Sequence, residues 1–427
     1  MQAPRRRDIP LPVAGQVTSL ELFFDLVFVF TITQLTATVL PGGWAVTGRT
    51  ALLLLLLWWM YGGYAWLTNA APPVTPRRRV LLVLGMIGLF VTALAIPHAY
   101  GSDRVVFACG YLVVVGVHAG MYVSEAARIT RGMVVQLLGW NMAGAVLGLV
   151  GAVFFESILA WWWLASFVVA VVLPRLFSIT ALNEPEGDGG PSFELVPGHF
   201  VERHGLMLLI ALGESVLAIG IGLGTGVVTI GLDRIAFAAI SLLLATTLFW
   251  AYFGLGEDAR AEAALDALPA ARAEAAGLAS YGYAFWVILF GIVLSAAGLH
   301  HALVQPTDRL TWEYAGQLCA GVGAFWVGLG LFRLALGLRG ALPRLALGLV
   351  LGAVTVVGAT VSGLLALVCL LLGSAALVLF EQRARASAPG EGPVRGDART
   401  GARPARGRSP RSPRRSRSGR LRLRPRR

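Results

Sequence analysis

The sequence predicts an all-α integral membrane protein with about twelve transmembrane helices, and three observations support that fold class. First, 56% of the 427 residues are hydrophobic and only 14% are charged, whereas soluble domains carry about 25% charged residues. Second, the hydrophobic residues form continuous runs of about 20, which is the length of a helix that crosses a bilayer. Third, these runs lack the alternation of β-barrel strands, and only helices and closed barrels satisfy backbone hydrogen bonds in lipid.

Twelve apolar segments follow one another between short polar breaks. They are expected at residues 20–40, 47–69, 79–97, 105–123, 133–154, 158–178, 204–223, 232–254, 280–299, 312–337, 345–359 and 361–380. One tilted helix over residues 345–380 is the alternative for the last two, but it would overshoot a hydrocarbon core of about 30 Å. We therefore expect a pair bent near Gly358 and Gly363. Residues 257–279, alanine-rich with mixed charges, predict a surface helix that Pro269 divides.

The arginines predict the topology. Residues 381–427 carry sixteen arginines against three acids, so this tail accounts for the net charge of +12. With twelve spans, the breaks richest in arginine fall on one side and the opposite breaks carry few arginines, so the positive-inside rule places both termini in the cytoplasm. The composition of the tail predicts disorder and attraction to anionic lipid headgroups. We expect no nucleic-acid partner, because no aromatic residue interleaves the arginines.

An internal repeat is suggested by a motif that occurs twice. Trp59, Tyr61 and Gly63 align without a gap with Trp250, Tyr252 and Gly254. These aromatic residues could line a cavity for a cation, although packing is the commoner role. We expect two six-helix halves in the same orientation, related by an axis along the membrane normal. The expected domains are a cytoplasmic segment 1–19, a first half 20–180, a linker 181–203, a second half 204–380 and the tail 381–427.

Several acidic and basic residues lie in or beside the apolar segments, where ionisable groups are expensive and usually functional. Glu21 and Asp25 are four residues apart and therefore share one helix face, with Glu21 expected near the exposed interface. Glu214 lies near the middle of the seventh segment, and Arg203 lies about three turns before it. Asp25 and Glu214 are expected to face each other and bind protons or small cations. The alternative is an interhelical salt bridge from Glu21 or Asp25 to Arg203.

Metal and cofactor chemistry is not indicated. The three cysteines, Cys109, Cys319 and Cys369, lie far apart in apolar segments, and no zinc spacing occurs. We therefore expect no metal and no cofactor. The absence of a P-loop and of other nucleotide-binding motifs argues against an ATP-driven pump.

Two segments resemble the signatures of the low temperature requirement protein A family of bacteria. Residues 21–29 read Glu-Leu-Phe-Phe-Asp-Leu-Val-Phe-Val, and residues 202–205 and 212–216 read Glu-Arg-His-Gly and Leu-Gly-Glu-Ser-Val, in the expected order. The resemblance covers about residues 15–380 and leaves the arginine tail outside. It implies an integral membrane protein of the bacterial cytoplasmic (inner) membrane. The positions that it marks are Glu21, Phe24, Asp25, Glu202, Arg203, Gly205, Gly213, Glu214 and Ser215.

Three functions fit these features. The leading hypothesis is a secondary transporter coupled to protons or cations, with candidate site residues Asp25, Glu214, Glu21, Arg203 and Ser215. The second is a membrane-embedded enzyme acting on lipid or isoprenoid substrates, with the paired acids and His118 as acid/base groups. The third is a non-catalytic membrane sensor or scaffold whose tail binds anionic lipid.

Overall fold

The protein is all-helical wherever its structure is described. The computed structural model describes residues 17–124, 131–176, 195–224 and 231–387, and every regular element in these ranges is a helix. Ten helices within the described residues are long and apolar enough to cross a membrane. The predicted fold class, a protein of many apolar helices, is thereby confirmed.

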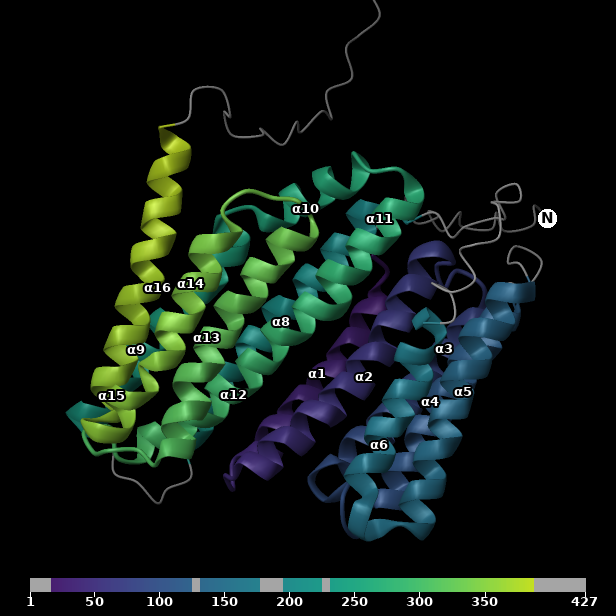
Figure 1. Ribbon diagram of the computed structural model, residues 1–427, viewed down its shortest axis with the longest axis horizontal. Helices are drawn as coiled ribbons and strands as arrows, with labels where there is room; N and C mark the ends of the chain where they lie inside the picture. Colours follow the sequence, from purple (N-terminus) through teal and green to yellow (C-terminus); the bar gives the residue numbers. More distant parts are fainter. Residues whose placement is uncertain (1–16, 125–130, 177–194, 225–230, 388–427) are drawn as a thin grey trace, which may run out of the picture. The chain divides into compact units, whose positions relative to one another are not determined.

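The helices of the first half follow the predicted segments closely (Figure 1). They are α1 (Ser19–Val39), α2 (Trp44–Ala70), α3 (Pro76–Ala95), the short η1 (Ile96–His98), α4 (Arg104–Ser124), α5 (Arg131–Phe154), η3 (Glu156–Ile158), α6 (Leu159–Phe167) and its continuation η4 (Val168–Val172). Local signals set the helix starts. Thr18 caps α1 in a reciprocal capping box with Glu21, and Thr75 caps α3 just before its first-turn proline.

The second half begins earlier and ends later than expected. Its elements are α8 (Pro197–Gly224), α9 (Leu232–Phe249), η5 (Trp250–Gly254), α10 (Glu257–Asp266), α11 (Ala270–Gly277), η6 (Leu278–Ala284), α12 (Phe285–Val304), α13 (Trp312–Ala335), α14 (Ala341–Ala353), α15 (Thr355–Thr360) and α16 (Gly363–Ala386). Pro197 starts α8 before residue 204, because proline suits the first helical position. Helix α16 runs past residue 380 into the expected tail.

Two predicted breaks lie where the sequence places them. Pro269 separates α10 from α11. Residues 345–380 form a pair, α14–α15 and α16, rather than one long helix. The turn between them packs tightly, since a Cβ on Gly363 would lie 3.3 Å from Ala302 and one on Gly358 would lie 3.1 Å from Ala315.

Helix α1 connects the two halves. It packs against α2 and α3 in its own half and against α8 and α12 in the second half, while α2 also contacts α8 and α12. In Figure 1, α1 and α2 accordingly lie between the other first-half helices and α8 and α12. The rest of each half is a chain of neighbours, α3–α4–α5–α6 and α12–α13–α14.

The outer surface of the helices is apolar. Helix α3 shows this most clearly, because large hydrophobic side chains cover its exposed face: Val80, Val83, Leu84, Ile87, Phe90, Val91 and Leu94. A contiguous exposed apolar face of this kind is typical of contact with lipid. The buried faces carry small residues that let helix backbones approach one another, as is common in membrane proteins.

Gly321 of α13 is the clearest of these close approaches. A Cβ at this position would lie 2.5 Å from the backbone nitrogen of Ser295 and 2.9 Å from the carbonyl oxygen of Gly291, both on α12. Backbone atoms cannot move aside as a flexible side chain can. The packing of α12 on α13 therefore requires glycine at residue 321.

We predict that Gly321→Ala destabilises the protein by about 1–3 kcal/mol, the usual effect of overpacking. Gly352→Ala on α14 is the matched control, because a Cβ there meets nothing within 4 Å. The measurement is the thermal midpoint of detergent-solubilised protein by fluorescence-detected size exclusion. Equal midpoints for the two variants would contradict this account of the α12–α13 contact.

Candidate functional site

The two sequence signatures meet each other where α1, α2 and α8 come together. Asp25 of α1 and Arg203 of α8 are both buried, with exposures of 0% and 1%. The Asp25 Oδ1 accepts hydrogen bonds from Arg203 Nε at 3.0 Å and Nη2 at 2.9 Å. Arg203 Nη1 donates to the hydroxyl of Thr68 on α2. The ion pair therefore joins three helices from both halves.

Glu21 lies one turn before Asp25 and belongs to the same cluster. Its Oε2 accepts from the Thr18 backbone nitrogen at 2.9 Å and from the Thr18 hydroxyl at 2.8 Å. Its Oε1 lies 3.6 Å from Arg203 Nη1 and 3.4 Å from His199 Nε2. The expectation that Glu21 is exposed near an interface is wrong, because α8 covers it completely and leaves 0% exposed.

Asn69 of α2 fixes the start of α8 against this cluster. Its Oδ1 accepts from the Val196 backbone nitrogen and its Nδ2 donates to the Val196 carbonyl, both at 2.9 Å. The same Nδ2 lies 3.2 Å from His199 Nδ1. These bonds replace helix-capping partners at the first turn of α8 and hold His199 toward Glu21.

Aromatic rings enclose the ion pair. The guanidinium carbon of Arg203 lies 5.5 Å from the ring centre of Phe24 and 5.6 Å from that of Tyr61, which is within cation–π range. His204, the next residue, packs on Phe200 with 4.3 Å between ring centres, and its Nδ1 lies 2.8 Å from the Phe200 carbonyl. The second signature therefore carries a charged residue and an aromatic-packed residue in succession.

Glu214 occupies a separate position on the same α1–α8 contact. It is 4% exposed, and its Oε2 accepts a 2.7 Å hydrogen bond from the Thr33 hydroxyl. No ion pair of Glu214 is found among the described residues. The expectation that Asp25 and Glu214 face each other is wrong, because Asp25 is paired with Arg203, about three helical turns away along α8.

The remaining signature positions are less involved. Glu202 is exposed on α8. A Cβ on Gly205 would make ordinary contacts with Phe253 at 3.6 Å and Tyr252 at 4.0 Å, and one on Gly213 would meet nothing within 4 Å. Ser215 lies in α8, but its side chain lies outside what the structure describes.

The structure contains a second buried charge network that the sequence did not predict. Glu257 of α10 lies 3.2 Å from Arg344 of α14, through Oε1 and Nη2, and also pairs with Arg333 of α13. Glu381 of α16 lies 3.0 Å from Arg333 and 2.8 Å from Arg344. Each of these residues lies at or near the end of an apolar segment, where charged residues are usually assigned to loops. The one feature of the sequence that could have indicated the network is that these segment ends carry charges of opposite sign.

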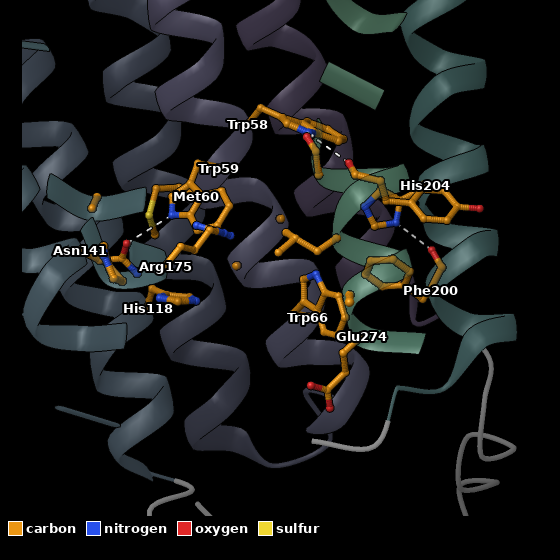
Figure 2. A pocket seen from close by; sticks show the side chains of 18 of the residues that line it. Trp58, Trp59, Met60, Trp66, His118, Asn141, Arg175, Phe200, His204 and Glu274 are labelled. Carbon is orange, nitrogen blue, oxygen red and sulfur yellow. Dashed lines mark hydrogen bonds between the residues drawn. The ribbon is translucent and has the colours of Figure 1, made fainter. Parts of the chain in front are cut away.

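A cavity of about 530 Å³ lies between the halves, and Figure 2 shows its lining. Its walls come from α2, α4, α5, η4, α8, α11 and η6. Aromatic rings form a large part of the walls: Trp58, Trp59, Trp66, Tyr122, Phe200, His204 and Tyr281 line them. Of the residues expected in an aromatic cavity, Trp59 takes part, whereas Trp250 is 45% exposed on the outside.

Four polar side chains also line this cavity. The guanidinium of Arg175 lies 4.6 Å from the ring centre of Trp59, whose Nε1 donates to Asn141 Oδ1 at 3.3 Å. His118 is 3% exposed, and neither of its ring nitrogens has a hydrogen-bond partner among the described residues. The same holds for the buried Oε1 of Glu274. The described residues contain no cluster of three or more His, Cys, Asp or Glu side chains that could hold a metal ion.

We predict that Arg203→Gln destabilises the protein by about 3–5 kcal/mol, because it leaves Asp25 and Glu21 buried without their counter-charge. Adding Asp25→Asn to that variant should recover part of the loss, since it removes one of the unpaired charges. Thermal midpoints in detergent measure both effects, with the exposed Arg77→Gln as control. An Arg203→Gln midpoint equal to wild type would refute the structural role of the pair.

Two comparisons with known proteins give a match. The profile of the family described as "Bacterial low temperature requirement A protein (LtrA)" matches residues 16–379. The chain is also 25% identical over 321 residues to an uncharacterized protein, RA0937, of Rhizobium meliloti (strain 1021), a match that covers 72% of this chain and 76% of that protein. No solved structure matches the chain significantly.

Proposed function

Because this chain belongs to the bacterial low temperature requirement A family and is a multi-pass helical membrane protein, we propose that it is a secondary transporter coupled to protons or small cations. Glu214 carries the proposal. It is a buried carboxylate, its hydrogen bond comes from the neutral Thr33 hydroxyl, and it lies on the contact between the halves. An ionised carboxylate buried without a counter-charge is costly, so this position favours uptake of a proton or cation.

The paired acids have another role in this proposal. Asp25 and Glu21 share the counter-charge of Arg203, and His199 also lies within reach of Glu21. Acids that have such a partner do not need a transported ion. We assign them to holding α1, α2 and α8 together while Glu214 exchanges its proton or cation. Ser215 follows Glu214 in the signature and is a candidate second ligand.

The proposed architecture has twelve spans. Helices α5 and α8, with 24 and 28 residues, are long enough to join the ten candidates already described. An even number of spans places both termini on one side, and the arginine distribution favours the cytoplasmic side of the bacterial inner membrane. The domain boundaries expected from the sequence follow this scheme, with the shifts at α8 and α16 described above.

A six-plus-six parallel repeat is supported by equivalent helix contacts. The pairs α1–α2, α1–α3, α3–α4 and α4–α5 correspond to α8–α9, α8–α12, α12–α13 and α13–α14. The closest approaches also correspond. A Cβ on Gly110 would meet the Thr92 backbone nitrogen and the Gly88 carbonyl at 3.0 and 3.2 Å, as one on Gly321 would meet Ser295 and Gly291. Such a repeat fits alternating access by rocking of two halves.

A membrane-embedded enzyme is the second candidate, and one observation favours it. His118 lines the cavity without a hydrogen-bond partner among the described residues, as a general acid or base awaiting a substrate would. The third hypothesis, a sensor or scaffold, rests on the arginine-rich tail and its expected attraction to anionic lipid. Deleting residues 388–427 should abolish the function of a tail-dependent scaffold and should leave a transporter active.

The test is a pH-jump current recorded on a solid-supported membrane from proteoliposomes. We expect Glu214→Gln to abolish the current while its size-exclusion profile stays that of wild type, because the ion-exchanging group is lost and no ion pair is broken. Glu202→Gln, an exposed carboxylate on the same helix, should retain the current. A Glu214→Gln variant with wild-type current would overturn the assignment, and a silent wild type would favour the enzyme.

A further inference from the structure

We propose that the cavity between the halves binds an organic monoanion, a carboxylate attached to an apolar or aromatic body. This inference rests on the proposed transporter function, for which it names the substrate class. It depends on the polar groups that line the cavity and on the surfaces between them.

The side of the cavity formed by α4, α5 and η4 presents hydrogen-bond donors. Figure 2 shows Arg175, His118 and Asn141 close together there. One Arg175 N–H donates to the Val171 carbonyl at 2.6 Å, and the guanidinium also interacts with Tyr283, whose ring centre lies 5.6 Å away. A guanidinium has more N–H donors than these two contacts use. The Asn141 Oδ1 accepts a hydrogen bond from Trp59, so the Asn141 Nδ2 can supply two donors. The His118 imidazole carries at least one N–H, whichever nitrogen is protonated. Three converging donors, one of them charged, are suited to a carboxylate.

His118 is the group that most needs a ligand. It is 3% exposed, and neither ring nitrogen makes a hydrogen bond of good geometry among the described residues, the Gly63 backbone being the one polar group that interacts with the ring. Its ring is fixed between Tyr64 and Tyr122, with ring centres 5.1 and 4.9 Å away. Gly63 makes room for it, since a Cβ there would lie 2.8 Å from His118 Nε2. A buried polar group held rigidly without a partner is costly unless something else binds it.

The cavity walls and Glu274 determine the size, polarity and charge of the ligand that can bind. Trp58, Trp59 and Trp66 present apolar ring surface, and 530 Å³ lies within the range of small-molecule sites, about 300–1,000 Å³. Glu274 lies on a different side of the cavity from Arg175 in Figure 2. Its carboxylate would repel a second negative charge at that end, which favours a monoanion over a dianion or a phosphate.

Within the proposed repeat, the second half supports the view that the cavity is not a packing defect of the fold. Trp66 follows Trp59 by the same seven residues that separate Glu257 from Trp250, and Tyr122 follows Gly110 by the same twelve that separate Arg333 from Gly321. Glu257 and Arg333 form the buried salt-bridge network. The proposed repeat can therefore fill this space with paired charges, yet the first half leaves it open and aromatic.

The test compares a carboxylate with its uncharged amide. Full-length protein in nanodiscs is titrated by isothermal calorimetry with 4-phenylbutyrate and with 4-phenylbutyramide. We expect wild type to bind the carboxylate about tenfold or more tightly than the amide, as a charge-assisted hydrogen bond implies. Arg175→Gln should remove this preference and leave amide affinity unchanged. Arg272→Gln, an exposed arginine on α11 that does not line the cavity, should behave as wild type.

Several outcomes would overturn the proposal: no binding of either probe, equal affinity of wild type for both, or a preference that survives Arg175→Gln. If that variant is not monodisperse, Asn141→Leu replaces it and should weaken carboxylate binding several-fold. Tighter binding of 4-phenylbutylphosphonate than of the carboxylate would also reject the carboxylate assignment. A pH-jump current lost in Glu214→Gln without anion binding would reject this ligand alone, whereas anion binding without any current would reject the transporter alone.

Discussion

The pairing of Asp25 with Arg203 is the interaction on which the arrangement of the two halves depends. Both side chains lie inside the protein with at most 1% exposure, and each would be costly without the other. Their hydrogen bonds extend to Thr68, while Glu21, His199 and Asn69 continue the network to the start of α8. The two family signatures are therefore the two sides of one contact.

Most of the fold was predictable because helix position in a membrane is a local property. Continuous apolar length predicted the helices, and Pro269 predicted the break between α10 and α11. Side-chain partners were not predictable in the same way. Spacing along α8 could not show that Glu214 would bond to Thr33, because that depends on how α1 crosses α8. An aromatic cavity was suggested by the sequence, but only Trp59 of the suggested residues lines it, because seven elements contribute to its walls.

The two buried polar regions of the protein are built in different ways. Four charged side chains from α10, α13, α14 and α16 form ion pairs with one another. The cavity is instead lined by aromatic rings and by His118, which has no hydrogen-bond partner among the described residues. Ion pairs that are satisfied inside the protein stiffen a region, whereas an open aromatic cavity leaves room for a ligand. The ion-paired region is thus suited to stay rigid while the cavity adapts to what it binds.

The distance in sequence between Asp25 and Arg203 has a consequence for biosynthesis. The two residues are 178 positions apart, so α1 enters the membrane with its two carboxylates long before α8 is made. An acidic residue at the centre of a membrane helix opposes insertion by about 2.5–3.5 kcal/mol, and Asp25, the seventh residue of α1, carries part of that cost. The cost is offset when α8, the first helix of the second half, brings Arg203 to Asp25. Insertion of α8 is therefore the step that stabilises α1 in the bilayer.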